Sequence, residues 1–359
     1  MFDLNTYTHD LPVLTILISF IIGLCFMPGV LSVARKRNFV VEPNGRTSHK
    51  GIIPNIGGIN IFISFLLTML LFSIEAFREF QFAILGVFII LIVGFVDDLI
   101  SIKPVWKLFG ECASAFFLIV VSDIRLSSLH GFLGINELSL GTSYLLSLFV
   151  FIVITNSLNL IDGVDGLASG LGILYCTFFG TYFNLTSNAN LAISAFAMVG
   201  SLVVFFIYNV FGGKRKIFMG DSGSLLLGYM IALYVFEFCR MNAHGSVLFQ
   251  FHMSAAPAVA ICVLSVPLFD TLRVMLTRRK RGVSPFKPDK NHIHHLLLKA
   301  GLKHIQVTTI LLLISLGYIC LGIVGRNWSI ELLVLIAFLI ASVLTYILWR
   351  IVDRKTLTK

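Results

Sequence analysis

The sequence is poor in charged residues and has no closely spaced pair of cysteines. Charged side chains make up 13% of the 359 residues, whereas hydrophobic side chains make up 57% and the mean hydropathy is +0.93. This balance excludes an ordinary soluble globular domain and indicates a polytopic membrane protein. The six cysteines lie in or beside apolar runs without a CxxC motif. We therefore expect buried thiols, with neither disulfides nor a zinc site.

Basic residues are missing from the first ten positions, where Asp3 and Asp10 stand instead. A cleavable signal begins with a basic segment, so we expect the first hydrophobic run to be a spanning helix. We predict one all-α integral-membrane domain over 1–359, with a bundle of about eleven transmembrane helices between 11 and 351. The expected helices are 11–34, 57–74, 82–98, 105–122, 143–161, 167–184, 190–211, 222–239, 255–274, 305–325 and 329–351.

The distribution of Lys and Arg predicts the orientation of this bundle. With the N-terminus on the periplasmic side, all but four of the 27 basic residues fall on the cytoplasmic side. The positive-inside rule then places the C-terminus in the cytoplasm. The cytoplasmic loops would be 35–56, 97–104, 162–166, 212–221 and 275–304. A basic membrane face attracts anionic lipid headgroups and anionic substrates. Nucleic-acid binding is the weaker interpretation, because no soluble basic domain is present.

The segment NSLNLIDGVDGL, residues 156–167, carries polar side chains at the junction of two apolar runs. Asn156, Asn159, Asp162 and Asp165 recur at every third residue, so they drift only slowly around a helix. Ionised groups beside a hydrophobic segment cost several kcal/mol unless they are solvated, paired or functional. These side chains suit sugar hydroxyls, a uracil ring or a metal ion. A plain polar turn between helices is the alternative.

Asp97 and Asp98 are adjacent at the end of the third expected helix. Neighbouring carboxylates raise one another's proton affinity, and Mg²⁺ or Mn²⁺ would relieve their repulsion. One of them could instead act as a base, or the helix end could simply lie in headgroup water. Lys107 and Glu111 are four residues apart on the next helix, so we expect them to pair with each other and to be structural.

Two further cytoplasmic segments contain groups suited to phosphate or metal. In the first inside loop, Arg46 and His49 could hold phosphate oxygens, although ordinary positive-inside residues explain them equally well. In FMGDSGS, Asp221 stands at the start of the eighth helix, where free N–H groups and the helix dipole favour phosphate. Asp221 could be an N-cap, a metal ligand or both.

The last large inside loop contains an HxHH cluster formed by His292, His294 and His295. Zinc is a weak interpretation, because no Cys or Glu stands at zinc-like spacing. Imidazoles also bind phosphate or relay protons. The basic run 278–281 is typical of a positive-inside anchor.

Together, the Asp-Asp pair, NxxNxxDGxDGL, FMGDSGS and HxHH resemble the polyprenyl-phosphate N-acetylhexosamine-1-phosphate transferases, glycosyltransferase family 4. The motifs occur in the family's order, and the resemblance covers roughly residues 46–301. The loop SPFKPDKNHIHHLLLKAG resembles the branch that starts O-antigen, enterobacterial common antigen and teichoic acid linkage units. The phospho-MurNAc-pentapeptide translocase branch tends to carry three consecutive histidines, which this chain lacks.

The resemblance implies a reaction at the cytoplasmic face of the bacterial inner membrane. UDP-GlcNAc and undecaprenyl phosphate would give GlcNAc-diphosphoundecaprenol and UMP, with Mg²⁺ or Mn²⁺ as cofactor. GlcNAc is the default N-acetylhexosamine of this branch, and GalNAc or a modified hexosamine is the alternative. Asp221 would be the best metal ligand. Asp97 or Asp98 would position or deprotonate the acceptor phosphate and could also reach the metal.

The resemblance also implies contacts for the donor and the phosphates. Asn159, Asp162 and Asp165 would bind the donor, with Asn156 beside them. Phe218 would stack on uracil, and Asn209 matches a family Asn, although two residues are inserted between it and FMGD here. The remaining phosphate contacts would come from Arg46, His49, His292, His294 and His295.

Three alternatives remain at this point. A translocase-like enzyme would use UDP-MurNAc-pentapeptide with the same machinery. An ion-coupled transporter would use Asp97, Asp98, Asp162 and Asp165 as ion sites, although transporter sites usually lie near the bilayer midplane in repeated halves. A lipid-binding scaffold would explain the arginines but not the aspartates. The apolar helix faces leave room for a homodimer.

Overall fold

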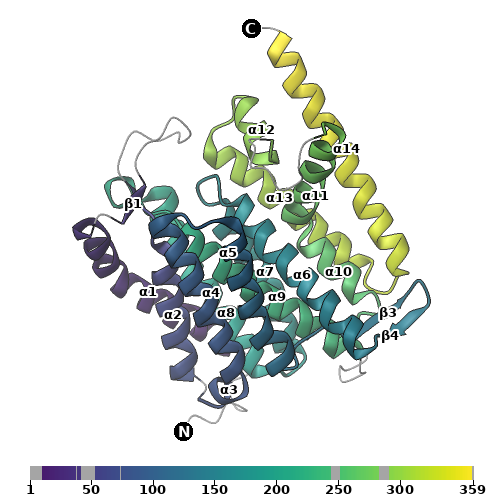
Figure 1. Cartoon of the computed structure of the whole chain (residues 1–359), viewed down its shortest axis with the longest axis horizontal. Helices are drawn as coiled ribbons and strands as arrows, with labels where there is room; N and C mark the ends of the chain where they lie inside the picture. The colour runs from purple at the N-terminus through teal and green to yellow at the C-terminus, as the bar shows by residue number, and fades with distance from the viewer. Residues whose placement is uncertain are drawn as a thin grey trace.

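The computed structural model describes residues 10–37, 39–41, 53–72, 74–243, 251–282 and 291–357. Within these ranges the chain forms a bundle of helices with two small antiparallel hairpins, β1–β2 and β3–β4 (Figure 1). The long helices are α1 (Leu11–Lys36), α2 (Gly57–Phe72), α4 (Gln81–Ile100), α5 (Pro104–Phe116), α6 (Leu140–Ile161), α7 (Leu167–Leu185), α8 (Ala189–Phe211), α9 (Gly220–Ala243), α11 (Ser265–Lys280), α13 (His304–Val324) and α14 (Ile330–Leu357).

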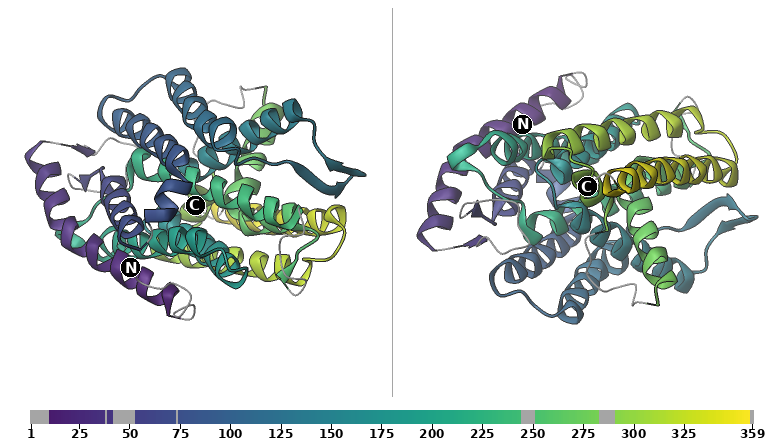
Figure 2. Two further views of the ribbon diagram at one scale, coloured as in Figure 1. Left: turned by 90° about the horizontal axis from the view of Figure 1, so that it is seen from below. Right: turned by 90° about the horizontal axis from the view of Figure 1, so that it is seen from above.

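Shorter elements connect the long helices. They are β1 (Val40–Val41), β2 (Ile53–Pro54), α3 (Ile74–Glu79), a π-helical turn η2 (Phe117–Val121) that continues α5, β3 (Ser128–Phe132), β4 (Ile135–Glu137), a 3-10 turn η3 (Gly213–Arg215), α10 (Ala256–Val263) and α12 (Ile293–Lys299). The β3–β4 hairpin projects away from the bundle in both views of Figure 2.

Long apolar helices confirm an all-α, multi-pass membrane protein. Among the described residues, eight helices are long and apolar enough to cross a membrane, or nine if the bent pair α10–α11 forms one span. A helix lies at each of the eleven expected places. The count of eleven spans stays a prediction, as does the orientation.

The prediction of one continuous helix over 255–274 is wrong. The structure divides it at Leu264 into α10 and α11, which are bent by 80°. Pro267 lies just after the break and has no N–H to donate to the carbonyl of Val263, so the helical ladder is interrupted there. The bend turns α11 away from the axis of α10.

Helix α9 forms the centre of the bundle, and its most apolar stretch is completely buried. It packs against α4 and α6, which carry Asp97, Asp98 and Asn159. Gly94 allows α4 to approach closely, because an added Cβ there would lie 2.5 Å from the Cα of Ser222. This contact brings the end of α4 against the start of α9.

The bundle has two distinct ends in Figure 1. The start of α1, the short helix α3 and the β3–β4 hairpin lie at one end. Helix α12, β1 and the last turns of α14 lie at the other, which we call the α12 end. The predicted cytoplasmic face corresponds to the α12 end.

Candidate active site

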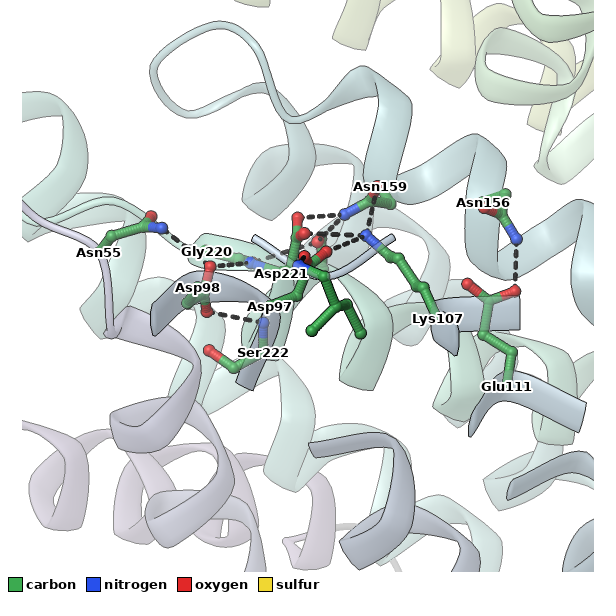
Figure 3. A network of polar contacts seen from close by, with 12 residues as sticks. Asn55, Asp97, Asp98, Lys107, Glu111, Asn156, Asn159, Gly220, Asp221 and Ser222 are labelled. Carbon is green, nitrogen blue, oxygen red and sulfur yellow. Dashed lines mark hydrogen bonds and ion pairs between the residues drawn. The ribbon is translucent and has the colours of Figure 1, made fainter. Parts of the chain in front are cut away.

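Four helix termini bring polar side chains together at the start of α9 (Figure 3). Asp97 and Asp98 come from the last turns of α4, and Lys107 comes from the first turns of α5. Asn159 comes from the end of α6, and Asp221 from the first turn of α9. Segments that are far apart in the sequence thus form one cluster of charges and amides.

Lys107 is the cation of this cluster. Its ammonium lies 2.8 Å from Asp221 Oδ2 and 3.0 Å from Asp97 Oδ2. It also donates to Asn159 Oδ1 at 3.4 Å. Lys107 does not pair with Glu111 as predicted. Glu111 Oε2 instead accepts a 2.6 Å hydrogen bond from Asn156 Nδ2. Lys107 therefore neutralises two carboxylates that would otherwise repel each other.

Asp98 caps helix α9. Its Oδ1 accepts from the backbone N–H of Asp221 at 2.7 Å, and its Oδ2 accepts from that of Ser222 at 3.0 Å. Asn55 Nδ2 donates to the same carboxylate at 2.8 Å. A carboxylate at these free N–H groups satisfies them and complements the helix dipole. Asp98 thus positions the first turn that carries Asp221.

Asn159 orients the carboxylate of Asp221. Its Nδ2 donates to Asp221 Oδ1 at 2.7 Å and to Ser224 Oγ at 2.8 Å. Because its Oδ1 faces Lys107, both ends of the amide are engaged. Asp221 is therefore held by one ammonium and one amide, which leaves its geometry well defined.

The two aspartates of the 162–166 loop have different surroundings. Asp165 Oδ2 lies 2.6 Å from Lys216 Nζ and 3.2 Å from His304 Nδ1. Although burial opposes ionisation, these partners hold the pKa of Asp165 below its ordinary value. The N–H of Asp162 donates to the carbonyl of Asn159 at 3.4 Å, but its carboxylate forms no hydrogen bond or ion pair with any described residue. Burial, and then the negative charges of Asp221, Asp98 and Asp165, raise its pKa to about 7.

Asn209 joins two loops beside this site. Its Oδ1 accepts from the N–H of Gly166 at 2.6 Å, and its Nδ2 donates to the carbonyl of Ile217 at 2.8 Å. The side chain is buried, with both ends of its amide occupied. This geometry favours a positioning role over the predicted substrate contact. Phe218 is half-buried, with Lys216 Nζ 5.6 Å from its ring centroid.

The HxHH cluster lies at the start of α12, with His292 just before the helix, and is held by α11. Asp270 Oδ2 lies 2.8 Å from His292 Nδ1, while Asp270 Oδ1 accepts from the N–H of Ile293 at 2.9 Å. Arg273 completes this anchor with an ion pair of 2.7 Å to Asp270. The cluster is therefore anchored to the bent span through Asp270 and Arg273.

His294 connects the histidines with the 162–166 loop. An added Cβ at Gly163 would lie 2.5 Å from His294 Nε2. Its ring stacks on His292 with centroids 5.8 Å apart, and it lies 4.2 Å from the ring of His295. Burial, reinforced by the neighbouring histidine His295, lowers the pKa of His294 to about 3. A neutral imidazole therefore packs against the loop that carries Asp162.

Several site residues were not identified from their sequence pattern. Asn55, Lys216, His304 and Arg273 stand outside the motifs, and the spacing of Lys107 predicts only a structural pair with Glu111. Asp270 stands outside the motifs, and spacing in the sequence does not indicate Arg273 and His292 as its partners. Arg46 and His49 lie outside the described residues.

Oxygen atoms around Lys107 are the strongest candidate ligands for a metal ion. Within the described ranges, no group of three or more His, Cys, Asp or Glu side chains is arranged as a metal site. Asp97, Asp221 and Asn159 nevertheless direct oxygens at one cation, the ammonium of Lys107. Carboxylate and amide oxygens are the donors that hard divalent cations prefer, so this set fits Mg²⁺ or Mn²⁺ if Lys107 moves aside.

Comparison with known proteins identifies the family of this chain. A model of glycosyl transferase family 4 matches residues 80–238, which include Asp97, Lys107, Asn159 and Asp221. An undecaprenyl-phosphate alpha-N-acetylglucosaminyl 1-phosphate transferase of Escherichia coli O157:H7 is 30% identical, over 95% of this chain and 93% of the relative. Relatives with the same name in Yersinia pestis and Pasteurella multocida are 28% and 29% identical, over 92% and 89% of this chain and 91% and 87% of theirs. The chain belongs to glycosyl transferase family 4.

Proposed function

We propose that this protein transfers GlcNAc-1-phosphate from UDP-GlcNAc to undecaprenyl phosphate and releases UMP. The main structural support for this proposal is the cluster at the N-terminus of α9. It is formed by Asp97, Lys107, Asn159 and Asp221. The names of the relatives, matched over nearly the whole chain, support this acceptor and this sugar phosphate. They favour this reaction over the translocase-like use of UDP-MurNAc-pentapeptide.

The cluster suits phosphoryl transfer because that chemistry needs alignment and charge neutralisation more than covalent catalysis. Asp221, with Asp97 and Asn159, would hold Mg²⁺ or Mn²⁺. When bound, this ion would neutralise charge on the diphosphate of the donor. Lys107 lies within reach of the same oxygens and would move to a phosphate oxygen of either substrate. Asp98 keeps the first turn of α9 in place throughout.

The remaining site residues would position the two substrates. Asp162 lies in the loop next to the cluster and would contact the sugar or diphosphate, while Asp165 holds Lys216 near Phe218. Phe218, which is half-buried, would stack on uracil. His295, which is partly exposed, would bind phosphate oxygens, while the buried His294, His292 and Asp270 would hold it in position. Arg46 and His49 would contribute from the first cytoplasmic loop.

A transporter fits the geometry less well. The carboxylates lie at helix ends near the α12 end of the bundle, whereas transporter ion sites usually lie at the midplane on broken helices. The broken span α10–α11 carries Asp270, but this carboxylate is saturated by Arg273, His292 and a backbone N–H. We place the enzyme in the bacterial inner membrane with this end in the cytoplasm.

The direct test is an assay of the purified protein in detergent with undecaprenyl phosphate, Mg²⁺ and separate UDP-sugars. We expect UMP and lipid-linked product with UDP-GlcNAc, and loss of both when lipid is omitted or EDTA is added. Turnover only with UDP-GalNAc or UDP-MurNAc-pentapeptide would change the substrate. Absence of UMP with every donor, from protein that remains folded, would overturn the proposal.

A further inference from the structure

A groove outside the active site runs between α11 and α14 near the α12 end of the bundle. It has a volume of about 360 Å³ and is lined by residues of these two helices alone. The two helices lie next to each other in Figure 1. Its walls are mainly apolar, and Phe269 and Phe338 meet in it with ring centroids 6.2 Å apart. An apolar groove that opens from a membrane bundle is accessible to lipid chains.

Aromatic side chains with polar tips mark one part of this groove. Tyr346 and Trp349 line it and are 63% and 51% exposed. Residues of this kind gather at the headgroup level of a bilayer, where one part of the ring is apolar and the other is hydrated. This part of the groove is therefore expected to lie at the membrane–water interface.

Positive charges lie at the same level. Lys280, on the last turn of α11, lines the groove, is exposed and forms no ion pair with any described residue. On α14, the guanidinium of Arg350 lies 5.9 Å from the ring centroid of Tyr346. The lining contains Arg273 and Lys280 but no Asp or Glu among the described residues. An apolar groove with cations at its mouth matches a lipid with a negatively charged headgroup.

We propose that the α11–α14 groove binds an anionic glycerophospholipid of the membrane. An acyl chain would lie along Phe269 and Phe338, and the phosphate would lie between Lys280 and Arg350. Trp349 and Tyr346 would border the glycerol region. The stem of Arg273 would contact the chain while its guanidinium keeps its ion pair with Asp270.

The position of the groove separates it from the proposed acceptor site. The carboxylate cluster is built from α4, α5, α6 and α9. Helix α11 packs against α6 as well as against α14, and the groove lies on its α14 side. A phosphate held by Lys280 and Arg350 would therefore belong to a bound membrane lipid and not to the reacting acceptor.

Native mass spectrometry of the full-length protein in neutral detergent tests this inference. Phosphatidylglycerol and phosphatidylcholine with identical acyl chains would be titrated separately into delipidated protein. We expect Lys280→Gln to weaken phosphatidylglycerol binding about fivefold, because a basic residue at an anionic headgroup has that effect. Arg279→Gln is the matched control: it makes the same charge change one residue away, at an exposed position outside the lining.

A second variant tests the groove itself. Ala341→Phe would fill the space between the helices, so we expect it to reduce binding of both phospholipids, in protein whose thermal stability is retained. Equal weakening by Lys280→Gln and Arg279→Gln, or equal binding of the two phospholipids, would overturn the inference. So would displacement of phosphatidylglycerol by equimolar undecaprenyl phosphate, because the groove would then hold the acceptor. These readouts measure lipid binding and do not depend on transferase activity.

Discussion

The ammonium of Lys107 lies 2.8 Å from the carboxylate of Asp221, although the two residues are 114 positions apart in the chain. Lys107 lies on α5, which begins at Pro104, and Asp221 lies on the first turn of α9. Their contact exists because α4 and α6 both pack closely on α9 and bring the neighbouring α5 with them. The pair lies at the centre of the carboxylate cluster, where the end of α4 and the start of α5 meet the start of α9.

Replacement of Lys107 should impair turnover strongly. Lys107→Gln removes the cation that neutralises Asp97 and Asp221, and we expect kcat for UMP release to fall by about 10²–10³-fold, as when one electrostatic partner is removed from other active sites. Lys103→Gln makes the same charge change at the exposed start of α5 and should leave kcat nearly unchanged. Equal kcat values for the two variants would show that Lys107 does not contribute to catalysis.

Substitution of Asp98 should lower both stability and activity, whereas substitution of Asp221 should lower activity alone. Asp98→Ala leaves the N–H groups of Asp221 and Ser222 without their acceptor, so we expect the free energy of unfolding to fall by about 1–2 kcal/mol, together with activity. Asp221→Asn retains the shape and should abolish UMP release without a comparable loss of stability. Thermal unfolding in detergent and the transferase assay would be measured on the same samples. If Asp221→Asn retained full activity, the metal-ligand assignment would be wrong.

A methyl group at Gly163 should displace the HxHH cluster. In Gly163→Ala the new Cβ would lie 2.5 Å from Nε2 of His294, whose buried ring is enclosed by His292 and His295. We expect a destabilisation of about 1–3 kcal/mol, typical of overpacking, and a lower kcat. Gly141→Ala is the control, because nothing lies within 4 Å of the equivalent Cβ. Identical thermal stability and kcat in both variants would show that the histidines do not depend on this contact.

Asp162 should make stability fall as pH rises. Its pKa in the folded protein is about 7, above the ordinary 3.8, so the folded state binds more protons than the unfolded state between these values. The free energy of unfolding therefore decreases as pH increases across this window. Asp162→Asn, which cannot ionise, should match the parent near pH 4 and exceed it in stability near pH 8. Thermal unfolding in EDTA measures this without metal, and a constant difference at both pH values would refute it.

The sequence by itself determined the class of the protein and the positions of its helices. Apolar runs of about 20 residues cannot remain in water and need internally bonded backbone in lipid, so every expected run is helical, although 255–274 is divided into α10 and α11. Asp97, Asn159 and Asp221 could be chosen because polar groups at the ends of apolar helices are costly unless they have partners. The order of the motifs indicates the family without any knowledge of contacts between helices.

Only the tertiary structure decided which of these groups meet. Spacing suggested that Lys107 pairs with Glu111, but helix packing places it between Asp97 and Asp221. The bend at Leu264 and the bond from Asp270 to His292 likewise depend on how α11 and α12 pack. Local pattern specifies a helix and its polar face, because hydrogen bonds along the backbone are local. The partner of a charged side chain depends on helix contacts between distant segments, which no single stretch of sequence encodes.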